Sequence, residues 1–326
     1  MKNLHLYFGL FSSLAMSILI SLNLGAVDAN CFDFFSPGFE RNILINIRLP
    51  RILLGLVVGL SLSSCGAAMQ GIFRNPLADP GLIGISSGAA FLVAVVIVLF
   101  SHLLDGFIGL YILSIAAFSG AILSAFIITQ IAKRHNKIIV VYVLLCGIAI
   151  NAISGALIGL LTFFSSDDQL RTLTLWTMGS LSGAQWPMVA VSTSLILPCL
   201  TVLIRCSAGL NILALGEESA VSAGLNYEKL KRSVIISVSI AIGSAVAVSG
   251  FIGFIGLVIP HLLRQLIGSD HRKLIPCSAL AGAFLLIISD LFARTVIAPA
   301  EMPVGLITAS IGGPIFLLIL IKEFRR

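Results

Sequence analysis

Long apolar runs follow one another along the chain, separated by short polar connections. A helix needs about 20 apolar residues to cross the roughly 30 Å hydrocarbon layer of a bilayer, so these runs are typical of membrane spans. Membrane β-strands would alternate apolar and polar residues instead, and these runs are apolar on every side. We therefore expect an all-α polytopic integral membrane protein with about ten transmembrane helices, the eighth of them short. The runs cover residues 6–26, 52–72, 83–102, 108–132, 138–162, 187–204, 233–252, 253–267, 276–296 and 304–321.

The composition excludes a water-soluble fold, because 58% of the 326 residues are hydrophobic and only 10% are charged. The first run follows Lys2 and ends near Ala26-Val27-Asp28-Ala29, a pattern also typical of a cleaved signal peptide. It is longer than a usual signal core, and an even number of spans requires it. We interpret it as a retained helix of a single transmembrane domain covering residues 1–326.

The 20 lysine and arginine residues are expected to divide unequally between the two sides of the membrane. If the N-terminus is cytoplasmic and the spans alternate, all but five of them fall on the cytoplasmic side, as the positive-inside bias requires. We therefore expect both termini in the cytoplasm. The net charge of +6 then reflects topology, and no nucleic-acid partner is expected. The five outer residues are Arg41, Arg48, Arg51, Arg171 and Arg294.

The sequence lacks the patterns that carry enzyme chemistry. It has no GxxxxGK[ST] loop to hold a nucleotide phosphate, no HExxH or GxSxG, and no His, Asp or Glu cluster at metal-ligand spacing. Asp290 is the one clear carboxylate within a span. The six cysteines are scattered without a CxxC pair and are interpreted as small buried apolar residues. We expect neither an enzyme, nor a metal site, nor a bound cofactor.

Three segments interrupt the apolar pattern in ways that suggest a transport path. Residues 47–51 (IRLPR) place two arginines and a proline at the outer mouth of the second span. Residues 69–84 end that span with two prolines, and residues 250–264 join a glycine-rich turn to the short eighth span. Irregular backbone at membrane depth is tolerated only where protein or a water-filled cavity covers it. The motif residues in the second and third segments are Asn75, Pro76, Asp79, Pro80, Pro260 and His261.

Six colinear segments from about residue 47 to the C-terminus closely resemble the membrane permeases of bacterial ABC importers for iron-siderophore, haem and cobalamin. The resemblance implies a homodimer with ten spans per subunit in the bacterial inner membrane. It also implies two cytoplasmic ATPase subunits that use ATP, and a periplasmic substrate-binding protein. The segments are IRLPR, MQGIFRNPLADPGLIGISSGA, LWTMGSLSG, LALGEESAVSAGLN, GFIGFIGLVIPHLLRQLIGSDHRKLIP and ARTVIAPAEMPVGLITASIGGPIF.

The polar segment 206–232 is the candidate site of coupling to the ATPase. Helical spacing of Ala and Leu, acidic residues in a first turn and a glycine at the stop predict two short helices separated by a glycine. A solvated connector is the alternative from the residues alone. The resemblance implies cytoplasmic coupling helices that dock on the ATPase subunits. The residues in question are Leu215, Gly216, Glu217, Ala220 and Gly224.

Arg48, Arg51 and Arg294 lie on the outer side although the topology bias acts against them, so they need a partner or a structural use. Asp290 and Glu301 are close enough in sequence to Arg294 for a local ion pair. In the resembling family, arginines at these motif positions receive acidic residues of the binding protein. That resemblance implies a mouth ringed by guanidinium groups in a dimer.

The outer segment 167–178 is the candidate gate of the path, through Arg171, Trp176 and Met178. Its sequence looks most like the haem permeases, and Arg171 could pair with a haem propionate. A short helix that gates the mouth for any substrate is the alternative, and ferric siderophores and cobalamin are the other candidate substrates. An ion-driven secondary transporter would need acidic ion sites and repeated halves, which are not evident. A channel would need a ring-forming selectivity sequence, and none is evident either.

Overall fold

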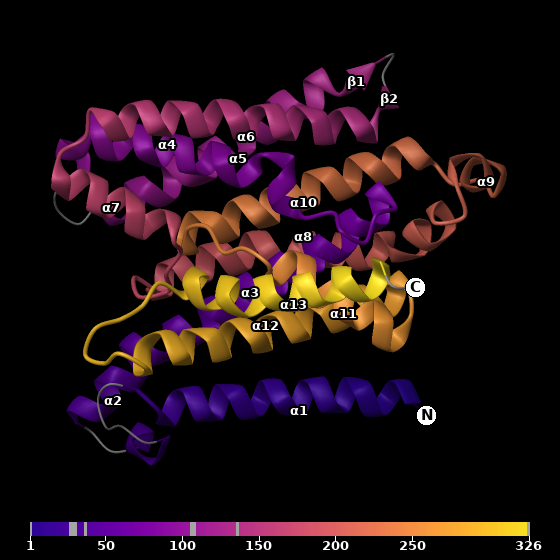
Figure 1. Ribbon diagram of the computed structural model, residues 1–326. Coiled ribbons are helices and arrows are strands. Elements are labelled where there is room, and N and C mark those ends of the chain that lie inside the picture. Colours follow the sequence, from indigo (N-terminus) through magenta and orange to yellow (C-terminus); the bar gives the residue numbers. More distant parts are fainter. Residues whose placement is uncertain (1, 26–30, 36–37, 105–108, 135–136, 325–326) are drawn as a thin grey trace.

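The computed structural model describes residues 2–25, 31–35, 38–104, 109–134 and 137–324, which form a bundle of long helices lying side by side (Figure 1). The long helices are α1 (Lys2–Asn23), α3 (Leu49–Phe73), α4 (Ile85–Leu99), α5 (Gly109–Ile131), α6 (Val140–Phe163), α8 (Trp186–Leu213), α10 (Tyr227–Ser249), α11 (Ile255–Ile267), α12 (His271–Thr295) and α13 (Val304–Phe324). The shorter elements are η1 (Cys31–Phe35), α2 (Phe39–Ile43), η2 (Leu44–Arg48), η3 (Pro80–Ile83), η4 (Ser101–Leu104), α7 (Asp167–Thr177) and α9 (Glu217–Ser222). A two-stranded hairpin, β1 (Lys133–Arg134) and β2 (Lys137–Ile138), joins α5 to α6 and is a small exception to the all-α expectation.

Seven helices in the described part of the chain are long and apolar enough to cross a membrane. Three shorter apolar helices, α4, α11 and the first part of α13, occupy the positions of the third, eighth and tenth apolar runs. A helical membrane protein is therefore confirmed, while about ten full spans stays a prediction.

Two span boundaries differ from the expected ones. Helix α8 continues to Leu213, because Leu210 and Leu213 are buried in the core and extend its apolar face. Helix α10 already begins at Tyr227. The connection between the two helices is therefore shorter than the expected segment 206–232.

Helix α3 is the centre of the bundle and contacts α8, α10, α11 and α12. A Cβ atom at Gly66 would lie 1.8 Å from the carbonyl oxygen of Gly256 in α11, and one at Gly59 would lie 2.6 Å from the Gly282 carbonyl in α12. Small residues let helices pack closely in lipid, where no water drives their association. These glycines therefore determine which helices can surround α3.

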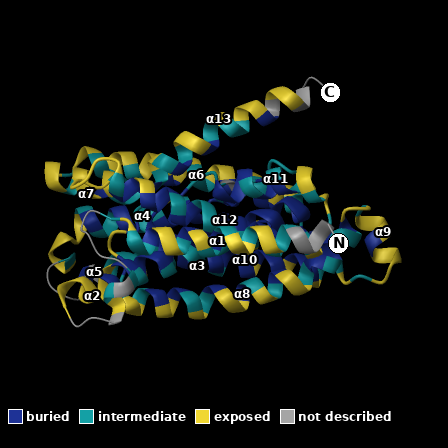
Figure 2. Cartoon of the chain, turned by 90° about the horizontal axis from the view of Figure 1, so that it is seen from below, coloured by how far each residue is buried: buried dark blue, intermediate teal, exposed yellow. Residues whose placement is uncertain are grey.

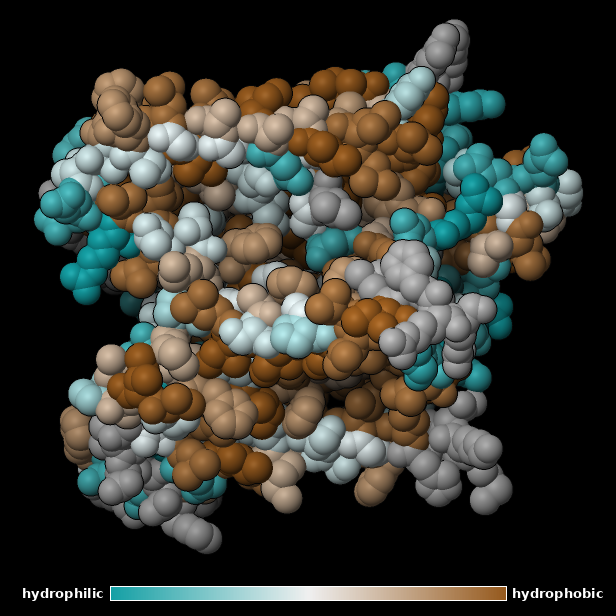
Figure 3. Space-filling model, in the orientation of Figure 1, coloured by the Kyte–Doolittle hydropathy of each residue, from teal (hydrophilic) through white to brown (hydrophobic). Residues whose placement is uncertain are grey.

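The two ends of the bundle carry different elements. The start of α1, the β1–β2 hairpin, α9 and the end of α13 lie at one end, which we call the inner end, and α2 and α7 lie at the outer end (Figure 1). Hydrophilic residues gather toward both ends, while apolar residues cover much of the middle (Figure 3). Figure 2 shows α13 leaving the bundle at an angle, with exposed residues along it. This distribution is that of a chain surrounded by lipid between two polar layers.

Candidate functional site

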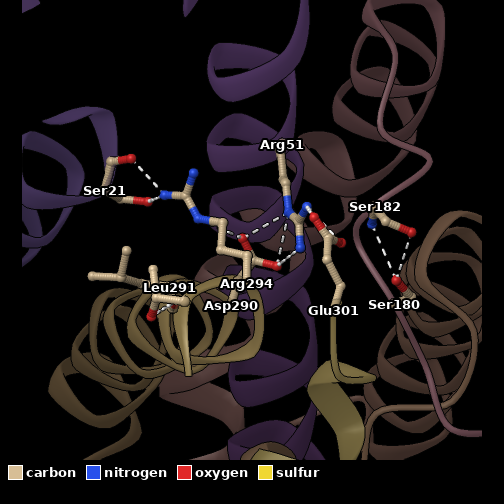
Figure 4. A network of polar contacts seen from close by, with 9 residues as sticks. Ser21, Arg51, Ser180, Ser182, Asp290, Leu291, Arg294 and Glu301 are labelled. Atoms are coloured by element: carbon tan, nitrogen blue, oxygen red, sulfur yellow. Dashed lines mark hydrogen bonds and ion pairs between the residues drawn. The ribbon is translucent and has the colours of Figure 1, made fainter. Parts of the chain in front are cut away.

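A buried network of charged side chains joins α3, α12 and the α12–α13 connection at the outer end (Figure 4). Arg51 donates through Nε and Nη2 to the carboxylate of Asp290 at 2.9 to 3.0 Å. Its Nη1 donates to both carboxylate oxygens of Glu301, at 2.9 and 3.0 Å. Arg51 and Asp290 are buried, whereas the Glu301 side chain is 41% exposed. Multiple charge-assisted hydrogen bonds of this kind hold the three elements together.

The other two outer arginines hold the last turn of α1. Arg294 donates from Nη2 to the carbonyl and the hydroxyl oxygen of Ser21, and Arg48 donates from Nη1 to the carbonyl of Leu22. The last four carbonyls of a helix have no partner within the helix, and cations near them are favourable. The two arginines therefore cap α1, which packs against α12 as an integral helix of the bundle.

The three arginines expected to ring the mouth are buried in this chain. Arg48, Arg51 and Arg294 are only 3%, 6% and 5% exposed. In this chain the fold brings acidic or carbonyl oxygens of distant elements to each of the three arginines. The local ion pair considered for Arg294 forms with Asp290, at 3.9 Å from Nε. Arg51 makes the shorter ion pairs with Asp290 and Glu301, both at 2.9 Å. These contacts do not test a docking role for the arginines.

The connection at the inner end forms one short helix, α9, and not the two that the sequence suggested. It projects from the end of the bundle beside the start of α10 (Figure 1). Val221 on the helix is 62% exposed, and Leu215, just before it, is 75% exposed, whereas Ala220 is fully buried and anchors the helix. The hydroxyl of Tyr227 donates to Glu217 and ties α9 to α10. An exposed apolar surface on a short anchored helix is suited to contact another protein.

Two glycines set the geometry of α9, as the sequence indicated. Gly216 precedes the helix with φ 112°, and Gly224 follows it with φ 78°. At the C-terminal end, the N–H of Gly224 donates to the Val221 carbonyl at 2.9 Å, and the N–H of Leu225 donates to the Ala220 carbonyl at 3.0 Å. This pair of bonds is the Schellman motif. A Cβ at either glycine would contact nothing within 4 Å, so only the backbone conformation requires glycine there.

A cavity of about 900 Å³ opens beside α9. Its walls come from α9, the start of α10, β2, the start of α6 and the end of α3. The carboxylate of Glu228 in this wall pairs with Lys231 at 2.6 Å and accepts from the N–H of Ile138 at 3.0 Å. The pair therefore joins α10 to the hairpin and fixes the base from which α9 projects.

The candidate gate lies at the outer end in and after α7. A capping box of Ser166 and Gln169 begins the helix, and the Gln169 amide also donates to the Val98 carbonyl of α4 at 3.3 Å. Arg171 is exposed on α7, whereas Trp176 and Met178 are half-buried. Of the three side chains, only that of Arg171 is therefore readily accessible from outside the bundle.

Trp176 and Met178 lie beside a close backbone junction that the sequence analysis missed. A Cβ at Gly250 would lie 2.3 Å from the Trp176 carbonyl oxygen, and one at Gly305 would lie 2.1 Å from the Met178 carbonyl oxygen. The junction brings together the α7–α8 connection, the end of α10 and the start of α13. In the sequence this junction is marked only by three glycines in separate segments, Gly179, Gly250 and Gly305. Only the packing of the helices shows that they meet.

The motif residues after α3 form tight turns, as the two prolines indicated. The side chain of Asn75 accepts from the Leu77 N–H at 2.9 Å, and Asp79 accepts from the Gly81 N–H at 2.6 Å. Asp79 is the N-cap of η3, and Pro80 is its first residue, where a missing N–H costs nothing. The helix break expected after residue 72 is therefore confirmed. Pro76 lies in the turn between α3 and η3.

Pro260 and His261 are both buried inside α11. Nε2 of His261 lies 3.1 Å from the amide nitrogen of Gln265 one turn later. Arg264, on the same helix, donates to the side chain of Gln70 in α3 at 3.2 Å. The short helix is therefore tied to the centre of the bundle by polar contacts as well as by the Gly66–Gly256 crossing.

A polar contact that the sequence analysis also missed joins α8 to α12 at the inner end. The Asn211 amide donates to Asp270 at 2.6 Å, and its oxygen accepts from the backbone N–H of His271 at 2.8 Å. Asp270 also caps α12 by accepting from the Arg272 N–H at 3.0 Å. The hydrogen bond from Asn211 holds the pKa of Asp270 below its ordinary value, so the cap is ionised near neutral pH. We call these three residues, Asn211, Asp270 and His271, the inner joint.

The sequence and the fold of this chain both match known proteins. The FecCD transport family matches residues 13–322 of the chain. The chain belongs to the FecCD transport family. It is therefore an ABC importer permease, and a secondary transporter finds no support among its relatives.

The FecCD relatives include permeases named for two different substrates. The chain is 48% identical over 315 residues to the hemin transport system permease protein HmuU of Yersinia pestis, covering 95% of this chain and 93% of that protein. It is 40% identical over 313 residues to the vitamin B12 import system permease protein BtuC of Vibrio vulnificus, covering 95% and 92%. A solved structure of a metal-chelate type ABC transporter in an inward-facing conformation matches with a TM-score of 0.86 and 32% identity, covering 97% and 98%. These matches extend over nearly the whole chain.

Proposed function

We propose that this FecCD permease moves haem from a periplasmic binding protein across the bacterial inner membrane into the cytoplasm. The observation that carries the choice of haem is the 48% identity to a hemin permease, against 40% for a vitamin B12 permease of similar coverage. Cobalamin is the second candidate because of that same relative, and a ferric siderophore is the third.

The proposed assembly is a homodimer with two ATPase subunits that hydrolyse ATP on separate chains. In this assembly α9 and the residues before it dock on an ATPase through the exposed apolar side chains of Leu215 and Val221. Ala220 holds the helix to the bundle, so force on α9 reaches α8 and α10. The inner end, with both termini, then faces the cytoplasm.

The proposed binding-protein site is the outer end above the network of Arg51, Asp290 and Glu301. Glu301 is the exposed member of that network and occupies Nη1 of Arg51 in the isolated chain. An acidic residue of the binding protein would take the place of Glu301 on Arg51. Arg51 can then be buried in the isolated chain and still bind the partner, because its ion pair with Glu301 is replaced by an ion pair with the binding protein.

Arg171 is the proposed first contact for a haem propionate, because it is exposed at the outer end on α7. Trp176 and Met178, half-buried behind it, are proposed to line the gate. An arginine pairs with a carboxylate by two parallel hydrogen bonds, which would orient haem at the mouth.

The test of the substrate is growth of a strain lacking this permease on one source at a time. We expect loss of growth with hemin as sole iron source, restored by the intact gene, and unchanged growth with ferric siderophores or with cobalamin where that vitamin is required. Loss of growth on cobalamin alone would show the second candidate to be correct. Arg171→Ala should lower hemin uptake several-fold, with Arg41→Ala, the other outer arginine not buried in the network, as the matched control.

A further inference from the structure

A groove of about 550 Å³ runs between α5 and α10 and belongs to none of the sites described above. The two helices touch closely where a Cβ at Gly243 would lie 2.9 Å from Cβ of Ala121. From that crossing the helices separate toward the inner end. The groove is the wedge between them, with Ala125 and Ile235 buried at its floor and Phe126 and Ile236 exposed on its walls.

The groove is apolar along most of its length and basic at one end. Of the described residues that line it, the two charged ones are Lys133 and Arg232, and both are exposed at the inner end. The acidic residue Glu228 lies nearby but lines the other cavity and pairs with Lys231. The hydroxyls in the groove, Thr129 and Ser239, donate to carbonyls of their own helices. The polar character of the site therefore comes mainly from two cations at its mouth.

The dimensions of the groove match one leaflet of a bilayer. Its α5 wall extends from Phe118 to Gln130, which at 1.5 Å per residue is roughly 18 Å. Half of a 30 Å hydrocarbon layer is about 15 Å. The basic end therefore lies at the headgroup level when the apolar part lies among acyl chains.

We infer that the α5–α10 groove binds one anionic phospholipid, with acyl chain between the helices and the headgroup phosphate on Lys133 and Arg232. The charge complementarity selects this occupant, because a zwitterionic lipid offers less net charge to two cations. Lipid bound there joins α5 to α10, and α10 begins at the base of α9. The site therefore places a lipid contact on α10, the helix that follows α9.

The test is native mass spectrometry of the full-length chain in mild detergent, titrated with phosphatidylglycerol or with phosphatidylethanolamine. We expect the intact chain to retain phosphatidylglycerol at a much lower concentration than phosphatidylethanolamine. Each basic side chain near a membrane surface contributes about a five-fold effect, so K133Q/R232Q should weaken retention of phosphatidylglycerol roughly 30-fold. The matched control R272Q/K273Q removes equal charge from the inner end outside the groove and should leave retention unchanged. Equal loss in both double variants, or none in K133Q/R232Q, would overturn the proposal.

A second measurement locates the acyl chain, since headgroup attraction alone could give the charge effect. Ile236→Cys on the groove wall is labelled with a maleimide in vesicles with and without phosphatidylglycerol, and Ile204→Cys, exposed on α8, is the control. We expect phosphatidylglycerol to slow labelling at residue 236 only. Equal labelling at residue 236 in both vesicles contradicts the groove as the acyl site. Disulfide cross-linking of two copies through Ile236→Cys would show that a second chain covers the groove, and would also contradict it.

Discussion

At the scale of single residues, Asp290 is the side chain on which the outer network depends. It accepts three hydrogen bonds from Arg51 and is only 3% exposed. Removing one partner of a buried pair leaves an uncompensated charge and costs about 3–5 kcal/mol, whereas replacing both partners with apolar residues is often neutral. We expect Asp290→Asn to lower the melting temperature of the purified chain clearly. Arg51→Met combined with Asp290→Leu should recover much of the loss, and a double variant as unstable as Asp290→Asn would contradict the pairing.

Glu301 provides a residue-scale test of the docking proposal that spares the buried arginines. Changing all three arginines to Glu would place acidic side chains in the interior and unfold the outer end. Glu301→Gln instead weakens the competitor for Nη1 of Arg51, and exposed charge pairs contribute about 0.2–1 kcal/mol. We expect the binding protein to dock two- to five-fold more tightly. Glu40→Gln, an exposed outer acid away from Arg51, should leave that affinity unchanged; if both variants behave alike, Glu301 is no competitor.

At the scale of single elements, α9 depends on a backbone conformation and not on space. Gly224 has φ 78°, and a β-branched residue there is strained, while Asn tolerates the left-handed region. We expect Gly224→Val to leave the permease in the membrane but to abolish substrate-stimulated ATP hydrolysis by the partner subunits. Gly224→Asn should keep most of it. Full stimulation with Gly224→Val would contradict a coupling role for α9, and Gly216→Val should behave in the same way.

A variant of the inner joint tests what holds the first turn of α12 in place. The Asn211 side chain donates to Asp270 and accepts from the backbone N–H and from Nδ1 of His271, so Asn211→Leu removes three hydrogen bonds that hold α8 to α12. Each hydrogen bond is worth about 1 kcal/mol, and more where a charge takes part. We expect amide hydrogen exchange to rise in the first turn of α12 and not at its other end. Uniform exchange along α12 would show that other contacts hold the joint.

At the scale of the whole molecule, the two ends of the bundle should lie on opposite sides of the membrane. Arg171 and Lys229 are exposed at the outer and inner ends respectively. In intact inner-membrane vesicles of known orientation, Arg171→Cys and Lys229→Cys should be labelled by a membrane-impermeant maleimide from opposite faces. The parent chain, which carries only the native cysteines, is the control for their own labelling. Labelling of both from one face would contradict the proposed topology.

The class of fold, the helix break after α3 and the glycine at which α9 ends could all be predicted from the sequence. Each depends on local chemistry: the length of an apolar run, a proline without an N–H, or a backbone angle that favours glycine. The same residues could not specify that Arg51 binds Asp290, that Gly250 and Gly305 meet the α7–α8 connection, or that Asn211 holds α12. The single short helix α9, in place of two, was also decided by packing, because the residues after Gly224 form the start of the long helix α10, where Leu230 is buried. Contacts between residues far apart in the chain depend on which helices pack together, and only the tertiary structure decides that.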